Sequence, residues 1–328
     1  MKVQTNSKLK LDDMMDLVVK AIESIEITGT PKELYEPIEY ILSLGGKRLR
    51  PTLVCLSCDA FNGDVTNALH AAKGIEVFHN FSLVHDDIMD NANLRRGKKT
   101  IHEKWDNNVA ILSGDAMLIK AYDFVLQGKY ENLSEILTVF NRAAIEVCEG
   151  QQLDMNFETQ DEVSIEEYIN MIKLKTSVLL GAALKIGAVI GGASKKDSQL
   201  MYDFGVNMGI GFQLMDDYLD AFGDPKKFGK KVGGDIISNK KTFLFIKALA
   251  LDNSGTMSDW LSEENFDESE KVNSVKGIYK NTGADSLCIN EMNKYYEVAL
   301  SKLDEINIDV HQKESLYAFA DYIRKRVK

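Results

Sequence analysis

The chain has 328 residues, of which 45% are hydrophobic and 27% are charged. This balance is typical of a globular protein; it excludes intrinsic disorder and allows one large domain or two ordinary ones. Asp and Glu number 50 against 39 Lys and Arg, so the formal net charge is −11. Such a chain is a poor candidate for general nucleic-acid binding, although a local basic cluster can still hold a small anion.

Long helices are expected along most of the chain. Only four prolines occur, and a proline costs about 3 kcal/mol inside a helix. Apolar residues at spacings of three and four predict helices over 68–89, 109–126, 134–148, 168–190 and 201–222. Glycine-containing breaks are predicted at 62–64, 95–97, 191–192, 223–225 and 233–234, and the acidic stretch 258–269 is predicted to be an exposed connection. We therefore predict one all-α domain spanning residues 1–328.

No segment has the roughly 18 uncharged apolar residues of a membrane-spanning helix. The longest candidate, 178–194, is interrupted by Lys185 and is rich in Gly and Ala. The first residues lack the apolar core of a signal peptide, and four cysteines in a chain of this length are not a disulfide framework. A cytoplasmic protein is therefore expected.

Two acidic clusters with the same spacing stand out, DDIMD at 86–90 and DDYLD at 216–220. On a helix, residues three or four apart share a face, where like charges destabilise it by about 0.2–0.5 kcal/mol per pair. A bound cation removes that repulsion, and Mg2+ favours one or two carboxylates together with substrate phosphates. Because each cluster follows a largely apolar helical stretch, we favour two parts of a magnesium site over two solvated acidic faces.

Basic motifs complement the acidic ones. GGKRLRP at 45–51 joins a glycine turn to three cations, and RRG at 95–97 follows the first acidic cluster. Lysines followed by a hydroxyl residue occur at 175–176 and 240–242. Arginine binds phosphate oxygens in a bidentate manner, and lysine acts as a point charge. Together these motifs indicate a site for Mg2+ and a diphosphate.

With these motifs in this order, the sequence resembles the trans-isoprenyl diphosphate synthases, the polyprenyl synthetase family. The resemblance covers residues 34–324 and includes GGKRLRP, HNFSLVHDDIMD, RRG, GQQLD, KTS, FQLMDDYLD and GKKVGGDI followed by KKT. It implies a helical bundle around a deep central cavity (the isoprenoid synthase type I fold) in a homodimer. It also implies head-to-tail condensation: an allylic diphosphate ionises, the double bond of isopentenyl diphosphate attacks the cation, and a proton is lost.

The resemblance implies which residues hold the allylic substrate, which would be dimethylallyl, geranyl or farnesyl diphosphate, and its Mg2+ ions, three per site. The expected metal ligands are Asp86, Asp90 and Asp216, supported by Asp87 and Asp220. The residues expected to hold the same diphosphate are Arg95, Lys175, Lys240 and Lys230.

The resemblance also implies a site for isopentenyl diphosphate. Its expected residues are Lys47, Arg50, His79 and Arg96. Thr176 and Gln213 match residues whose oxygens face the developing carbocation, and with Arg95, Lys175 and Lys240 they form the expected catalytic group. Neutralising the leaving diphosphate is catalysis by preorganised electrostatics, so no enzyme nucleophile is expected and no side chain is assigned as a general base. His85, next to the acids, is expected to pack beside the site.

Product length is expected to depend on residues that precede the first acidic cluster. Phe81 lies five residues before Asp86 and is followed by the small Ser82, and Phe78 lies nearly one turn deeper. In the family, a bulky aromatic at the position of Phe81 shortens the product. Because the cluster also lacks the two-residue insertion of many bacterial synthases, it looks most like the type I geranylgeranyl synthases. We predict a C20 product, with C15 as the alternative; an ordinary core aromatic is the competing interpretation of Phe81.

Two other functions compete with chain elongation. A class I terpene cyclase shares the all-α fold and the first acidic cluster but needs no isopentenyl diphosphate site. A non-catalytic partner subunit tends to lose one of the aspartate-rich motifs. This chain keeps both motifs together with GGKRLRP and RRG, which favours the active synthase.

Overall fold

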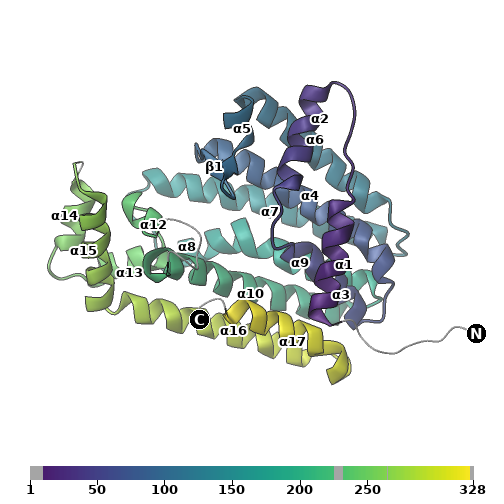
Figure 1. The fold of residues 1–328 in the computed structure, drawn as a ribbon. Helices are drawn as coiled ribbons and strands as arrows, with labels where there is room; N and C mark the ends of the chain where they lie inside the picture. Colours follow the sequence, from purple (N-terminus) through teal and green to yellow (C-terminus); the bar gives the residue numbers. More distant parts are fainter. Residues whose placement is uncertain (1–9, 225–231, 264, 326–328) are drawn as a thin grey trace, which may run out of the picture. The chain divides into compact units, whose positions relative to one another are not determined.

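The computed structural model describes residues 10–224, 232–263 and 265–325, and this part of the chain is helical apart from one short hairpin (Figure 1). The elements are α1 (Leu11–Glu23), α2 (Lys32–Ser43), α3 (Leu49–Ala60), α4 (Val65–Met89), β1 (Leu94–Arg95), β2 (Lys98–Lys99), α5 (Ile101–Lys104), α6 (Asn107–Leu126), α7 (Leu133–Thr159), α8 (Ile165–Ile172), the π-helix η1 (Lys173–Ser177), α9 (Val178–Ile190), α10 (Lys195–Phe222), α12 (Gly234–Ile237), α13 (Phe243–Leu251), α14 (Thr256–Ser262), α15 (Glu268–Asn281), α16 (Ala284–Glu305) and α17 (Val310–Arg324). The predicted all-α fold is therefore confirmed.

The described residues fall into two compact units. The first lies within Met1–Asn141, Ala182–Tyr202 and Ile306–Ala318, and the second within Arg142–Gly181, Asp203–Glu305 and Phe319–Lys328. The single domain and the central cavity expected from the sequence stay predictions. None of the described helices is long and apolar enough to cross a membrane.

Helix α4 organises the first unit, where it packs against α3 and α6 and also contacts α1, α2 and α5. Asp64 caps its N-terminus by accepting a hydrogen bond from the backbone N–H of Thr66 at 2.9 Å, which satisfies a donor that the helix itself cannot use. Gly74 lets α4 and α6 approach closely. A Cβ there would lie 2.5 Å from Val125 Cγ2 and 2.8 Å from the backbone oxygen of Ala121.

In the second unit, α13 contacts α8, α14, α15 and α16, and α12 packs on α15. Helix α8 begins with a capping box in which Ser164 and Glu167 bond each other's backbone N–H groups. Such reciprocal bonds satisfy two free donors of the first turn and fix where the helix that precedes the KTS motif begins.

Most of the predicted helices agree with the structure, but two regions differ. Residues 168–190 are not one α-helix, because the π-helix η1 separates α8 from α9. A π-turn adds one residue to a single turn, which apolar spacing averaged over a long window does not reveal.

The exposed connection predicted over 258–269 is wrong in part, because α14 occupies its first half. Met257 is buried there, and the indole nitrogen of Trp260 donates to Ser274 Oγ at 2.7 Å. This short helix is held by contacts with α15 that its polar composition does not indicate.

The close approach of α4 and α6 can be tested by Gly74→Ala. The added methyl group has to displace the backbone of α6, so we expect a loss of about 1–3 kcal/mol in the free energy of unfolding, measured by urea denaturation. Gly277→Ala in α15 is the matched control, because no atom lies within 4 Å of its new Cβ. That change should be neutral or stabilise the protein by about 0.5–1 kcal/mol. Equal stabilities of the two variants would contradict the packing argument.

Candidate active site

The KTS motif lies in the π-helix η1, which carries Lys175 and Thr176. Two glycines let neighbouring helices of the second unit close on it. A Cβ at Gly150 of α7 would collide with the backbone nitrogen of Lys175, and a Cβ at Gly209 of α10 would lie 2.7 Å from Cα of Ser177. Single π-turns of this kind frequently occur at functional sites, and here the turn sets the direction of two predicted catalytic side chains.

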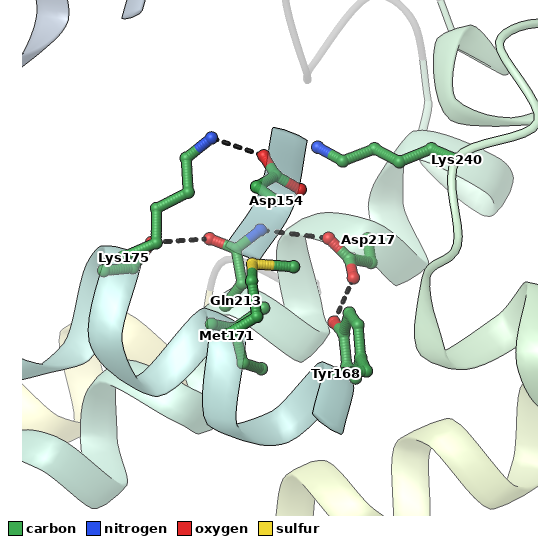
Figure 2. Close-up of a pocket in the computed structure, with 9 residues that line it drawn as sticks. Asp154, Tyr168, Met171, Lys175, Gln213, Asp217 and Lys240 are labelled. Atoms are coloured by element: carbon green, nitrogen blue, oxygen red, sulfur yellow. Dashed lines mark hydrogen bonds and ion pairs between the residues drawn. The ribbon is translucent and has the colours of Figure 1, made fainter. Parts of the chain in front are cut away.

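Both of these side chains are held by partners from other helices (Figure 2). Lys175 Nζ lies 2.5 Å from Asp154 Oδ2, an ion pair in which both side chains are largely buried. The hydroxyl of Thr176 donates to Gln213 Oε1 at 3.4 Å. The ammonium and the hydroxyl are therefore oriented before any ligand binds.

Asp217 of the second acidic cluster is buried next to Gln213 and Tyr168. Its Oδ1 accepts from Gln213 Nε2 at 3.0 Å, and its Oδ2 accepts from the hydroxyl of Tyr168. Burial raises the pKa of Asp217 to about 7, with a further contribution from Asp235, whereas Lys240 and these two hydrogen bonds lower it. Desolvation favours the protonated carboxylic acid, and the hydrogen-bond donors favour the ionised carboxylate. The pKa is the net result of these opposing effects.

These residues line one pocket of the second unit (Figure 2). Its lining consists of Asp154, Tyr168, Met171, Ile172, Lys175, Thr176, Gln213, Asp217 and Lys240. Two ammonium groups and several hydrogen-bonding oxygens thus converge on a surface that also has apolar side chains. Such a lining suits an anionic head attached to an apolar body.

The last acid of this cluster, Asp220, connects α10 to the short helix α12. Its Oδ2 accepts from the backbone N–H of Asp235 at 3.0 Å, and its carbonyl oxygen accepts from the N–H of Gly233 at 2.7 Å. The backbone N–H of Lys240 then donates to the carbonyl of Asp235 at 2.9 Å. This chain of bonds fixes the backbone that carries Lys240 relative to the acidic cluster.

The first acidic cluster lies at the C-terminal end of α4 in the first unit. Asp87 is 1% exposed and accepts from Arg95 through Nε at 2.9 and 3.2 Å and through Nη2 at 2.5 Å. Burial raises the pKa of Asp87, and the bonds from Arg95 oppose that shift. Asp86 is half-buried, and Asp90 is exposed at the helix C-cap, where the helix dipole disfavours a negative charge and favours a cation.

A buried ion pair shapes the GGKRLRP turn. Arg48 has a left-handed backbone with φ of 48°, and its guanidinium donates to Glu76 and, at 2.8 Å, to the carbonyl of Leu42. Asn80 Nδ2 also donates to Glu76, at 3.0 Å. Because both charges are almost fully buried, the pair holds the turn in one conformation and sets the places of Lys47 and Arg50 on either side of it.

Arg50 and His79 meet in the same unit, with Arg50 Nη1 lying 3.1 Å from His79 Nε2. Burial, with added repulsion from Arg50, Arg96, Arg95 and Arg48, lowers the pKa of His79 well below 6.5. The imidazole is therefore neutral near pH 7 and accepts a hydrogen bond from Arg50. Burial and nearby Arg96 also lower the pKa of Arg50 to about 10, against the opposing effect of Glu76. A crowded group of cations like this one favours the binding of an anion.

Arg96 completes this basic group. Its guanidinium donates to the carbonyl of Gly45, and a Cβ at Gly46, where φ is +139°, would lie 2.8 Å from Arg96 Nη2. The second glycine of the motif is therefore required both by its backbone conformation and by the arginine packed on it.

No three His, Cys, Asp or Glu side chains within residues 10–224, 232–263 and 265–325 are close enough to hold a metal ion by themselves. Within each unit, the carboxylates of one acidic cluster fit Mg2+, which favours one or two carboxylates and completes its coordination with water and with phosphate oxygens.

The sequence profile of the family described as Polyprenyl synthetase matches residues 31–281. The chain belongs to this family. A geranylgeranyl diphosphate synthase from Sulfolobus acidocaldarius is 37% identical over 327 residues, covering 96% of this chain and 98% of the relative. A geranylfarnesyl diphosphate synthase from Aeropyrum pernix is 35% identical, covering 91% of this chain and 96% of the relative. A solved geranylgeranyl pyrophosphate synthase matches with a TM-score of 0.93 and 45% identity over 98% of this chain and 100% of that one.

The structure brings some of the residues expected from the polyprenyl synthetase motifs together within each unit. Arg50, His79 and Arg96 are associated in the first unit, and Lys175, Thr176, Gln213 and Lys240 share the pocket of the second. Arg95, expected on the diphosphate, is bonded to Asp87. Lys230 lies outside the described residues.

The family motifs did not assign a role to several residues that support the site. Asp154 is the last residue of GQQLD, and nothing near it in the sequence indicates that it pairs with a lysine. Glu76 is a single acid in the apolar stretch GIEVF, which does indicate a buried partner. Tyr168 has no sequence signal, because its bond to Asp217 joins residues 49 positions apart.

The low pKa of His79 predicts how stability changes with pH. The unfolded chain takes up a proton on this histidine near pH 6.5, and the folded chain does not. The free energy of unfolding is therefore unaffected by this group above about pH 6.5 and decreases as the pH falls below that value. The free energy of unfolding should therefore decline less steeply between about pH 7 and 5 in His79→Gln, which cannot be protonated there. Urea denaturation at a series of pH values measures both slopes. Identical slopes would show that folded His79 does take up the proton.

Proposed function

We propose that this chain is a trans-prenyl diphosphate synthase that condenses isopentenyl diphosphate with an allylic diphosphate to give a C20 product. The observation that carries the proposal is the pocket in which Lys175, Lys240, Thr176 and Gln213 are oriented around buried acids. Such a prenyltransferase needs cations for a leaving diphosphate, and oxygens near the carbon from which it departs. The family membership and the C20 names of similar proteins support the same activity.

The allylic diphosphate would be bound by Lys175, Lys240 and Arg95, with Lys230 as a further contact. Mg2+, with three ions per site, would be held by Asp86, Asp90 and Asp216, with Asp87 and Asp220 supporting them. When bound, Mg2+ neutralises charge on the departing diphosphate. The buried partners Asp154 and Asp217 keep the lysine and the glutamine in place, so little reorganisation is needed during ionisation.

Isopentenyl diphosphate would occupy the basic group of the first unit. Lys47, Arg50 and Arg96 provide the charge, and neutral His79 can donate or accept a hydrogen bond without adding a further positive charge. Thr176 and Gln213 direct oxygen atoms at the developing cation, and the released diphosphate is the base that takes the proton after the new bond has formed. No side chain needs to act as a nucleophile.

The metal assignment predicts a selective loss of activity in Asp86→Asn and Asp216→Asn. Each change removes one negative charge with almost no change in shape, so turnover should fall at least about 100-fold while the melting temperature changes little. Asp13→Asn, at an exposed position of α1, is the matched control and should retain full activity. If either variant turns over at the wild-type rate, its aspartate is not a metal ligand.

The test of the function is a product assay on the purified chain with Mg2+, labelled isopentenyl diphosphate and each allylic primer in turn. A dominant C20 chain is expected, and a dominant C15 chain would support the farnesyl alternative. Consumption of the primer without isopentenyl diphosphate would indicate a cyclase. Inactivity of the chain alone would indicate a partner subunit.

Product length would be limited by Phe81, which is 8% exposed and packs on Phe78 at a ring-centroid distance of 5.5 Å. Ser82 Oγ donates to the backbone oxygen of His79 at 2.9 Å and adds no bulk. Phe81→Ala removes the ring, and the dominant product should lengthen by at least one C5 unit. An unchanged product distribution by chromatography would leave Phe81 as an ordinary core residue.

The active form would be a homodimer, as the family resemblance implies, and it would act in the cytoplasm. One surface supports association, because α6 exposes Leu112, Ile119 and Leu126, spaced seven residues apart, by 59%, 65% and 51%. Apolar residues gathered on one face commonly mark interaction sites. Sedimentation should give twice the mass of a single chain, and Ile119→Asp should shift it toward the monomer. A wild-type monomer at assay concentrations would contradict the proposal.

A further inference from the structure

A row of ring contacts continues on both sides of Phe81 within the first unit. In spatial order its rings are His85, Phe81, Phe78, Phe140 and Tyr122, with successive centroids 4.8, 5.5, 5.4 and 4.9 Å apart. Three of these residues lie on α4, Phe140 lies on α7 and Tyr122 on α6. Most contacts are edge-to-face, an arrangement that aromatic rings prefer.

His85 is the end of this row nearest the acidic cluster, and α6 fixes its imidazole. His85 Nε2 lies 3.2 Å from the carbonyl oxygen of Ile111, so that nitrogen carries the proton and donates. Gly114, one turn further along α6, leaves room for the ring. A Cβ at Gly114 would collide with Nε2 and would lie 2.6 Å from Cδ2 of the imidazole.

Phe81 is therefore held between two rings. Phe78 is almost fully buried and packs in turn on Phe140, so that side is rigid. On the other side, the imidazole of His85 meets the Phe81 ring at an interplanar angle of 67°. The position of the Phe81 ring depends on whether this imidazole stays in place, because close-packed neighbours are what confine a buried aromatic side chain.

We propose that His85 is a positioning residue that determines product length by holding Phe81 in place, with Gly114 giving its imidazole the room to do so. This inference rests on the proposed function, in which the apolar tail of the growing prenyl chain ends against Phe81. Without the imidazole, the Phe81 ring gains free volume on the side of α6 and can turn aside for a longer tail. His85 then acts through Phe81 and does not itself contact the substrate.

The decisive experiment measures product length for wild type, His85→Ala, Phe81→Ala and the double variant, under one set of assay conditions. His85→Ala should raise the ratio of C25 to C20 product at least about fivefold, equivalent to roughly 1 kcal/mol between the two outcomes. In the Phe81→Ala background the same change should add less than twofold, because the ring it positions is absent. An unchanged ratio in His85→Ala, or an equal effect in both backgrounds, would overturn the proposal.

Two further substitutions separate ring packing from the hydrogen bond. His85→Phe keeps a ring and loses the donor to Ile111, so it should retain the wild-type product. His85→Asn keeps a polar group and loses the ring, so it should lengthen the product. The reverse pattern would contradict positioning by packing. Asp13→Asn, exposed on α1, is the control and should leave the ratio unchanged.

The outcomes also distinguish this inference from the proposed function. If wild type makes a C20 chain and His85→Ala makes the same distribution, the function stands and the inference fails. If wild type makes no prenyl product at all, the function fails and the inference fails with it. Retained condensation rates in His85→Ala show that the protein is folded, so a change in product length then reports the position of Phe81.

Discussion

A charged side chain that is removed from water needs an opposite charge or several hydrogen-bond donors, because an uncompensated buried charge is strongly destabilising. This requirement determines the arrangement of both polar regions. Asp87 is compensated by Arg95, Glu76 by Arg48, and Asp154 by Lys175. Each pair joins a motif residue to a partner from another segment. The side chains that would face a ligand are therefore positioned by charges that must be paired in any case.

The same requirement explains the unusual backbone of the two basic motifs. Arg48 takes a left-handed conformation and Lys175 lies in a π-turn, both less favourable than ordinary helix. The bonds of Arg48 to Glu76 and of Lys175 to Asp154 compensate for that cost. Gly150 then allows the helices to close around Lys175. The buried ion pairs thus stabilise a strained backbone that holds the cationic side chains in fixed positions, where they could bind an anion.

Helix α4 combines the polar and the apolar requirements of a prenyl diphosphate synthase. Its C-terminal end carries the first acidic cluster, and Phe81 and Phe78 lie one and two turns before it. A single rigid helix therefore fixes the distance between the group that would hold the diphosphate and the rings that would stop the tail. In the proposed function, chain length would then depend on packing around α4, where α6 contributes Gly114 and the carbonyl of Ile111.

Local sequence patterns were enough to predict the all-α class, most of the long helices, and the position of both acidic clusters on helices, because apolar spacing and proline content act within a few turns. The sequence also indicated a diphosphate site, since DDIMD, DDYLD and the basic motifs GGKRLRP and RRG are local patterns. Three features became known only from the folded chain: Asp87 binds Arg95, Tyr168 and Gln213 donate to Asp217, and residues 258–262 belong to a helix. Partners such as Tyr168 and Asp217 lie 49 residues apart, so the path of the backbone, which no local pattern specifies, decides which charges meet.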